Sequence, residues 1–235
     1  MTGGGSWASM AAGLVLPRGC AGCDAPDEVL CPSCRALFDR TVAVPMPECP
    51  MGAAYACAVY EGAVRRAVLG WKDHGDEECD RAFATALCTL AERVDVLRRL
   101  GASGKDGVLV VPAPSSARST RRRGRRHLMP SARALAAWCG RSGIDARVRR
   151  VLANAVDGGK AVETVGARGR AARLGGRIRV RGSAGLAGSR VILVDDIITT
   201  GATMRSCVAA LDAAGAARVV CLALAATPRY GVSAM

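Results

Sequence analysis

Short apolar runs without polar alternation recur along the chain. Val191 to Val194 is one such run, and residues 107–111 and 219–225 contain two more. Short runs of this kind, bounded by polar turns, are typical of strands that are buried on both faces of a parallel sheet. Residues 53–60, with β-branched and aromatic side chains, and residues 147–152 are also predicted to be strands.

Between these runs, apolar residues recur at the spacing of an amphipathic helix. The pattern predicts helices over residues 61–71, 79–100, 133–139 and 203–214, and a short apolar helix over 7–16. Because strands and helices alternate, the predicted fold class is α/β, with a mostly parallel sheet flanked by helices.

Shifts in composition divide the chain into four parts. Residues 1–17 are expected to be a flexible Gly-rich tip and the short helix, and residues 18–50 a small cysteine-containing module followed by a Pro-containing linker. The main α/β domain is expected over 51–228, with a mobile, polar, Gly-rich loop at 153–173. Residues 229–235 are expected to be a tail.

The composition limits both the core and the partners. Half of the residues are apolar but only 3% are aromatic, so alanine, valine and leucine must fill most of the core. The net charge of +13 comes almost wholly from arginine and suits a polyanion such as nucleic acid or pyrophosphate. No stretch could span a membrane, and the apolar residues 10–16 lack the basic flank of a secretory signal. We therefore expect a cytoplasmic protein with reduced thiols and no membrane partner.

Four of the eleven cysteines form two closely spaced CxxC pairs. Each pair forms a turn that directs two sulfurs at one metal, and zinc prefers four such ligands in a tetrahedral arrangement. The spacing therefore predicts a structural zinc site formed by Cys20, Cys23, Cys31 and Cys34. The alternative is a set of free or redox-active cysteines. The cysteines from Cys79 onward are expected to be small buried side chains.

An acidic pair and a Thr/Gly loop follow the apolar run at 191–194. Asp195 and Asp196 are expected at the carboxyl end of this strand, the edge at which open α/β sheets bind ligands. Two ionised carboxylates can accept hydrogen bonds from the two neighbouring hydroxyls of a ribose. The loop then offers backbone N–H groups and hydroxyls to a phosphate at a helix N-terminus, through Thr199, Thr200, Gly201, Ala202 and Thr203. The alternative is a solvated aspartate pair followed by a threonine cap.

A second polar loop follows the strand at 107–111 and is expected at the same edge of the sheet. It begins with Pro112 and continues into a run of hydroxyl and arginine side chains. The candidate ligands for pyrophosphate or another anion are Ser115, Ser116, Arg118, Arg121, Arg122 and Arg123. A nucleic-acid contact is a second possibility, although no aromatic residue interleaves these arginines to stack on bases. The third is a solvated basic loop.

The block V-I-L-V-D-D-I-I-T-T-G-A-T at 191–203 resembles the binding motif for phosphoribosyl pyrophosphate (PRPP) of type I phosphoribosyltransferases. The resemblance implies that Asp195 and Asp196 hold the ribose hydroxyls and act in catalysis. It also implies that the loop at 199–203 holds the 5-phosphate, and that PRPP binds together with Mg²⁺. Residues 51–228 would then be a phosphoribosyltransferase-like domain.

The wider layout resembles the ComF family, which includes the GntX-like proteins and joins a CxxC…CxxC zinc module to a phosphoribosyltransferase domain. The resemblance rests on residues 59–66, on Pro112-Ala113-Pro114, on residues 121–124 and on the block at 191–203. Two segments depart from the family pattern. Residues 123–127 read R-G-R-R-H where R-G-F-N-Q is frequent, and residues 169–173 lack the glutamate and asparagine of E-R-x-x-N.

These features support two main hypotheses of different classes. The first is a phosphoribosyltransferase that transfers phosphoribose from PRPP to an unidentified nitrogen acceptor. The second is a non-catalytic module that senses PRPP or a nucleotide and binds single-stranded DNA or a DNA-uptake or DNA-processing partner, as the ComF resemblance implies. A purine-salvage transferase is a weaker third, because residues 219–227 offer no aromatic side chain to stack on a purine.

Overall fold

The computed structural model describes residues 19–49, 51–103, 107–155, 178–182 and 185–228. The helix predicted over 7–16, most of the loop predicted over 153–173 and the predicted tail lie outside these residues.

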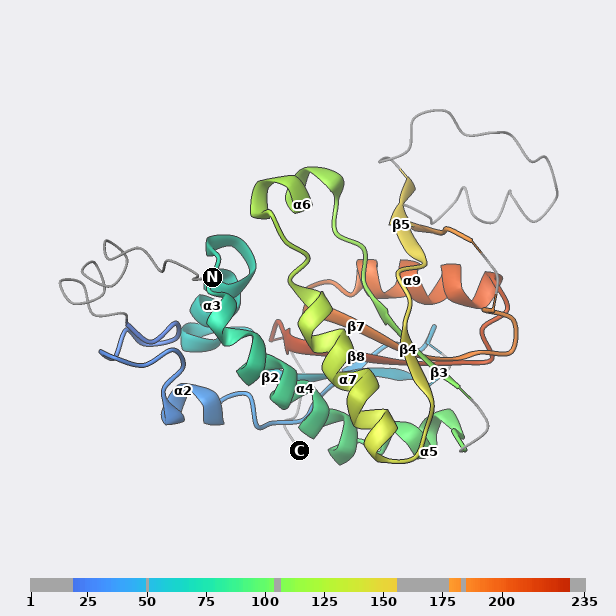
Figure 1. Cartoon of the computed structure of the whole chain (residues 1–235), viewed down its shortest axis with the longest axis horizontal. Coiled ribbons are helices and arrows are strands. Elements are labelled where there is room, and N and C mark those ends of the chain that lie inside the picture. The colour runs from blue at the N-terminus through green and yellow to red at the C-terminus, as the bar shows by residue number, and fades with distance from the viewer. Residues whose placement is uncertain (1–18, 50, 104–106, 156–177, 183–184, 229–235) are drawn as a thin grey trace, which may run out of the picture.

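A six-stranded sheet forms the centre of the molecule (Figure 1). Its strands follow the order β1-β2-β8-β7-β3-β4, and every neighbouring pair is parallel except β1 and β2. The strands are β1 (Val42–Pro45), β2 (Ala53–Val59), β3 (Val108–Pro112), β4 (Ala146–Val148), β7 (Arg190–Ile198) and β8 (Arg218–Ala226). The prediction of a mostly parallel sheet flanked by helices is therefore confirmed.

Strand β7 lies in the interior of the sheet, between β8 and β3. The side chains from Val191 to Val194 are fully buried, as expected for a run with no polar alternation. In the register of the sheet, Val194 lies opposite Pro112 of β3 and Leu222 of β8. The loops that follow β3 and β7 therefore leave the sheet side by side at its carboxyl edge.

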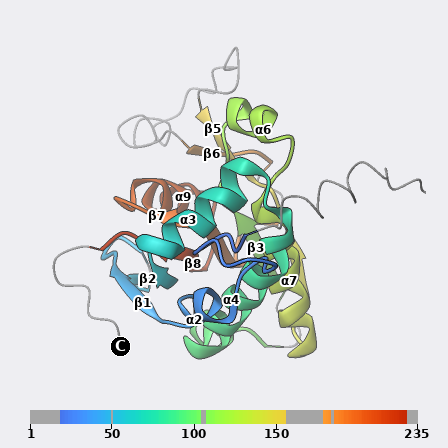
Figure 2. The same cartoon turned by 90° about the vertical axis from the view of Figure 1, so that its left-hand side faces the viewer.

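Helices cover both faces of this sheet (Figures 1 and 2). One face is covered by α4 (Asp80–Arg93), α5 (Val96–Leu100) and α7 (Leu128–Arg141), and the other by α9 (Ala202–Ala213). The apolar stripe of α4 faces the sheet because Phe83, Leu87 and Leu90 recur at helical spacing, and all three are buried. Among the described residues, no helix has the length and apolar character needed to cross a membrane.

Shorter elements surround this core. Helix α2 (Pro32–Ala36) lies in the cysteine-rich segment. Helix α3 (Gly62–Leu69) continues directly into a π-helical turn, η1 (Gly70–His74), and a 3₁₀ turn, η2 (Glu77–Cys79), follows after two intervening residues. Helix α6 (Ala117–Arg123) follows β3, and β5 (Leu152–Asn154) pairs with β6 (Ile178–Val180) in a separate antiparallel sheet. In both views α6 and β5 project from the same side of the molecule (Figures 1 and 2).

Residues 41–50 were expected to be a linker, but they contain an edge strand of the sheet. Val42 and Val44 of β1 are buried, and β1 pairs with β2 in antiparallel register. Pro45 stands at the last position of this edge strand, where its missing N–H does not interrupt the sheet. Pro45 therefore indicates the end of a strand, and not a linker as predicted.

Two helix predictions differ from the structure at their ends. The helix predicted over 79–100 is interrupted at Asp95, whose φ of 51° is incompatible with a continuous α-helix. The helix predicted over 133–139 begins earlier, at Leu128, and Pro130 is its third residue. Proline is tolerated in a first helical turn because the N–H groups there lack intrahelical partners in any case.

The strand predicted over 147–152 is two strands. Residues Ala146–Val148 form β4 in the large sheet, whereas Leu152–Asn154 form β5 in the small one. Asn154 and Ile178 are partners in the small sheet, so residues 178–180 form the second strand of this pair. The chain thus leaves the large sheet after β4 and places β5 beside the loop that follows β3.

Candidate functional site

The four cysteines of the two CxxC pairs form one cluster. The sulfurs of Cys20, Cys23, Cys31 and Cys34 all lie within 4.8 Å of one another. Four thiolates bound to one zinc ion at about 2.3 Å lie roughly 3.8 Å apart, so this spacing fits tetrahedral coordination. Backbone N–H groups of Gly22 and Cys31 donate to Sγ of Cys20, over 3.4 and 3.2 Å, which favours a thiolate at that position. The cluster could therefore hold a zinc ion.

The cysteine cluster is attached to the main core. The guanidinium of Arg66 in α3 donates to the carbonyl oxygen of Gly22 over 2.7 Å. Phe38, just after α2, packs against Phe83 of α4 with ring centroids 5.0 Å apart. The cluster and the sheet are thus linked through a shared apolar core.

Asp195 and Asp196 lie within the last part of β7. Asp195 is opposite Ala223 of β8, and the strand continues to Ile198. Both side chains are buried, with 9% and 5% exposure. The sheet therefore places two carboxyl groups in the protein interior at the edge where β3 and β8 also end.

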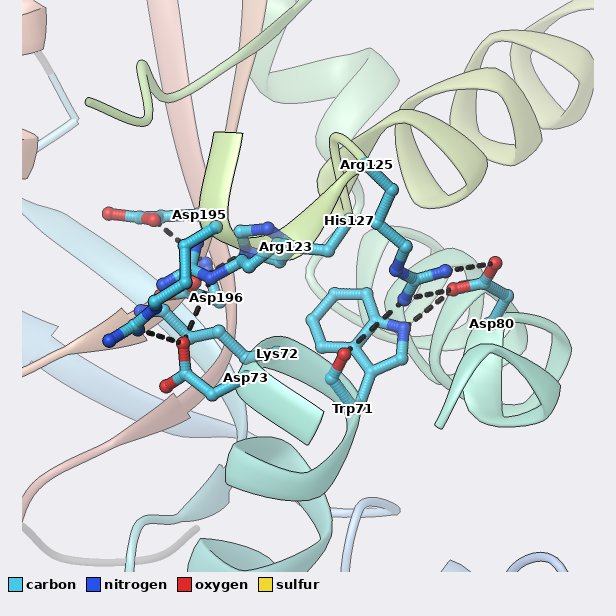
Figure 3. Close-up of polar contacts among 10 residues, drawn as sticks. Trp71, Lys72, Asp73, Asp80, Arg123, Arg125, His127, Asp195 and Asp196 are labelled. Carbon is cyan, nitrogen blue, oxygen red and sulfur yellow. Dashed lines mark hydrogen bonds and ion pairs between the residues drawn. The ribbon is translucent and has the colours of Figure 1, made fainter. Parts of the chain in front are cut away.

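The two carboxyl groups have different partners. Oδ1 of Asp195 accepts from the backbone N–H of Asp196 over 2.8 Å. Oδ2 of Asp196 accepts from Nζ of Lys72 over 2.7 Å and from Nε2 of His127 over 2.7 Å (Figure 3). Because an ionised carboxylate only accepts hydrogen bonds, His127 acts here through its Nε2–H group.

The different partners of the two carboxyl groups give them different pKa values. Burial raises the pKa of Asp195 to about 8, and the neighbouring charge of Asp196 acts in the same direction. Burial would also raise the pKa of Asp196, but the hydrogen bond from His127 and the charge of Lys72 outweigh it and lower the pKa. Near neutral pH the pair therefore carries about one negative charge, on Asp196.

The Thr/Gly loop connects β7 to the N-terminus of α9. Gly201 caps the helix in a left-handed conformation, with φ of 76°, which glycine adopts without strain. The N–H of Ala202 donates to Oγ1 of Thr200 over 3.3 Å, and Thr199, Thr200 and Thr203 are exposed. Backbone N–H groups in the first turn of a helix, together with hydroxyls, form a suitable site for a phosphate.

One cavity of ≈ 310 Å³ joins the acidic pair, this loop and the loop after β3. The predicted ligands that line it are Ser115, Ser116, Arg123, Asp195, Asp196, Thr199 and Thr203. Lys72 also lines the cavity. The register of β3 beside β7 explains why segments about eighty residues apart meet here. Thr200, Gly201 and Ala202 belong to the same loop but lie outside the lining.

The predicted arginine ligands do not act as one group. Arg123 lines the cavity, yet its Nε lies 2.9 Å from Oδ1 of Asp73. Arg122 pairs with the same carboxylate oxygen over 2.9 Å and is 68% exposed. Arg121 lines a different cavity, and the side chain of Arg118 is outside the described part of the chain. Of the three arginine side chains that the structure describes here, Arg123 alone lines the cavity of the acidic pair.

The second cavity, of ≈ 360 Å³, adjoins the first and shares Ala113, Pro114 and Ser115 with it. Its charged lining residues are Arg121, Arg126, Arg150 and Arg181. No carboxylate belongs to the described lining. Burial lowers the pKa of Arg150, and the charges of Arg126 and Arg181 add to this effect. Guanidinium groups that line one cavity without a carboxylate in its described lining favour an anionic ligand.

Sequence reasoning missed the turn η1. Lys72 and Asp73 had no predicted role in the site, and His127 was noted only as a replacement for glutamine. Trp71 of this turn is fully buried, and its Nε1–H donates to Oδ1 of Asp80 over 2.6 Å. Arg125 pairs with the same aspartate (Figure 3). No local pattern marks these residues, because their partners come from distant segments.

Comparison with known proteins agrees with this geometry. Residues 131–232 match the family model of the phosphoribosyl transferase domain. The match contains β7, α9 and β8, and therefore the acidic pair and the Thr/Gly loop, whereas Lys72, Ser115 and the four cysteines precede it. A search of curated proteins finds no match. The chain therefore contains a phosphoribosyltransferase-type domain, preceded by a cluster of four cysteines.

Proposed function

We propose that this protein binds PRPP in the cavity beside β7. The observation that carries the proposal is the convergence of an acidic pair, a helix N-terminus with threonines and a serine-containing loop on one cavity. Asp195 and Asp196 bind the two ribose hydroxyls. The loop 199–203 binds the 5-phosphate, and Ser115 and Ser116 bind the pyrophosphate.

The reaction we propose is transfer of phosphoribose to a nitrogen acceptor. The bond between C1 and the pyrophosphate oxygen breaks, the acceptor nitrogen bonds to C1, and the acceptor loses a proton. Mg²⁺, held mainly by the phosphates of PRPP and by water, would neutralise charge on the departing pyrophosphate. The ionised Asp196 orients the ribose and stabilises the positive charge that develops at C1. In this proposal Arg123, which lines the cavity, contributes positive charge near the pyrophosphate.

The four cysteines and the order of the cysteine cluster and the α/β domain along the chain support a ComF-like protein with structural zinc. We also propose that the protein is cytoplasmic. The acceptor stays unassigned in this proposal. Residues 123–127 and 169–173 lack the amide side chains that are frequent in that family, and these would be natural hydrogen-bonding groups for an acceptor or for PRPP.

A second candidate function is a non-catalytic module that senses PRPP or a nucleotide and binds single-stranded DNA. The observation that favours it is the second cavity, which four arginines line without a carboxylate in its described lining. Together with the net charge of +13, this surface suits a phosphate backbone.

One experiment separates the two candidates. The protein is incubated with PRPP and Mg²⁺ in the presence of single nitrogen acceptors, and released pyrophosphate is measured. The same preparation is titrated with single-stranded DNA at about 50 and about 200 mM salt. A transferase is expected to release pyrophosphate in an acceptor-dependent manner. A DNA-binding module is expected to release none and to lose at least about tenfold in DNA affinity over this salt range. Pyrophosphate release without DNA binding would remove the second candidate.

A further inference from the structure

Asp196 receives its two side-chain hydrogen bonds on one oxygen. Nζ of Lys72 and Nε2 of His127 both lie 2.7 Å from Oδ2. Within the described residues, no hydrogen bond reaches Oδ1 of this carboxylate. A carboxylate held through one oxygen keeps the lone pairs of the other available for a ligand.

His127 is a buried donor rather than a surface group. Its side chain is 2% exposed, and its ring meets the edge of Trp71 with centroids 5.0 Å apart. Nδ1 of His127 is buried without a hydrogen-bond partner in the described residues. The ring is therefore fixed by packing on one side and by Asp196 on the other (Figure 3).

Lys72 reaches Asp196 from a turn that is anchored at both sides. Trp71 precedes it, lies fully buried against Phe83 and donates to Asp80. Asp73 follows it and pairs with Arg122 and Arg123 of α6. The residues that flank Lys72 thus anchor the turn from which its side chain, 23% exposed, enters the cavity.

We propose that Lys72 and His127 are positioning residues that hold Asp196 ionised and oriented, so that its Oδ1 accepts a hydrogen bond from a ribose hydroxyl. The inference rests on the proposed function and extends it to residues outside the matched range 131–232. A buried carboxylate without a cationic or hydrogen-bonding partner takes up a proton, and it then no longer offers a charged acceptor.

The test compares two fragments of PRPP, ribose 5-phosphate and inorganic pyrophosphate, by calorimetry. Only the first carries the hydroxyls that Asp196 is proposed to bind. In Lys72→Met, the affinity for ribose 5-phosphate is expected to fall about 10- to 100-fold, as for loss of a hydrogen bond to a charged group, while pyrophosphate affinity changes less than about threefold. Lys72→Arg keeps the charge and should retain most of the affinity.

Arg65→Met is the matched control, because it removes one positive charge from an exposed position of α3. Both affinities are expected to stay within about twofold of the wild type, which separates the specific contact from a general loss of positive charge.

His127 provides an independent pair of variants should Lys72→Met fold poorly. His127→Gln can still donate an N–H group to Asp196 and should retain ribose 5-phosphate binding, whereas His127→Leu should lose it. A role only in folding would weaken binding of both fragments equally.

Three results would overturn the proposal. Lys72→Met and His127→Leu could bind ribose 5-phosphate as the wild type does, or each could weaken both fragments to the same extent. In these cases PRPP binding by the wild type still supports the proposed function. If the wild type itself binds neither PRPP nor ribose 5-phosphate, the proposed function and this inference fail together.

Discussion

Purified wild-type protein is expected to contain about one zinc ion per chain, and Cys20→Ser should lose it together with the fold of residues 19–38. Sγ of Cys20 is buried and accepts two backbone N–H groups, so serine would remove a ligand and weaken two hydrogen bonds. This segment has few large apolar side chains of its own, chiefly Leu30 and Phe38. In small zinc domains the metal supplies on the order of 10 kcal/mol of folding free energy.

Elemental analysis measures the zinc content, and hydrogen exchange measures the fold of residues 19–38. Cys88→Ser is the control, since Cys88 is half-buried in α4 and lies outside the cluster. It should retain zinc and protection. A Cys20→Ser protein that is metal-free yet as protected as the wild type would contradict a structural role for the metal.

Asp195→Asn is expected to stabilise the protein in the absence of ligand, by about 1–3 kcal/mol at pH 8 and with little change at pH 4. The folded-state pKa of Asp195 is raised to about 8, chiefly by burial. Because the folded state then binds a proton that the unfolded state has released, wild-type stability falls as pH rises from about 4 to 8. Asparagine does not titrate, and its Oδ1 can still accept from the N–H of Asp196.

Thermal unfolding at several pH values tests this prediction. The melting temperature of Asp195→Asn should exceed that of the wild type by several degrees at pH 8, and the difference should vanish toward pH 4. Asp212→Asn, at an exposed position of α9, should show no such pH-dependent difference. An equal or lower melting temperature for Asp195→Asn at pH 8 would show that Asp195 is stabilised as a carboxylate.

The main strands and the position of the acidic pair were predictable because their signals are local. The run at Val191–Val194 contains no polar residue, so it indicates a buried parallel strand without knowledge of its neighbours. The aspartates and threonines follow this strand directly in the sequence. Their meeting with Ser115 follows from the rule that ligands bind at the carboxyl edge of such sheets.

The charged partners of the site were not predictable in the same way. Lys72 approaches Asp196 only because α3 continues into a π-helical turn, and helical periodicity does not specify that change. His127 reaches the same carboxylate because α7 begins before Pro130. Each contact forms only when segments far apart in the sequence pack together, so no single stretch of sequence predicts it.

The contacts of the arginine-rich segment were also not predictable from the sequence. From the sequence, its arginines were candidate ligands for pyrophosphate, a nucleic-acid contact or a solvated basic loop. In the structure Ser116 caps a helix over Ala117–Arg123, and this helix gives its arginines different partners. Asp73 pairs with Arg122 and Arg123, while Arg121 lines the second cavity. Charge density predicted an anionic partner, and only the helix determines which arginines can reach it.

Calorimetric titration of Mg²⁺–PRPP into wild type and Asp195→Asn/Asp196→Asn determines whether the acidic pair forms a PRPP site. The asparagines keep the size of the side chains but remove the negative charge of Asp196 and both carboxyl groups that are proposed to bind the two ribose hydroxyls. We expect saturable binding to the wild type and to Asp212→Asn, and at least about 100-fold weaker binding to the folded double variant. Equal affinity of the double variant and the wild type would contradict the assignment.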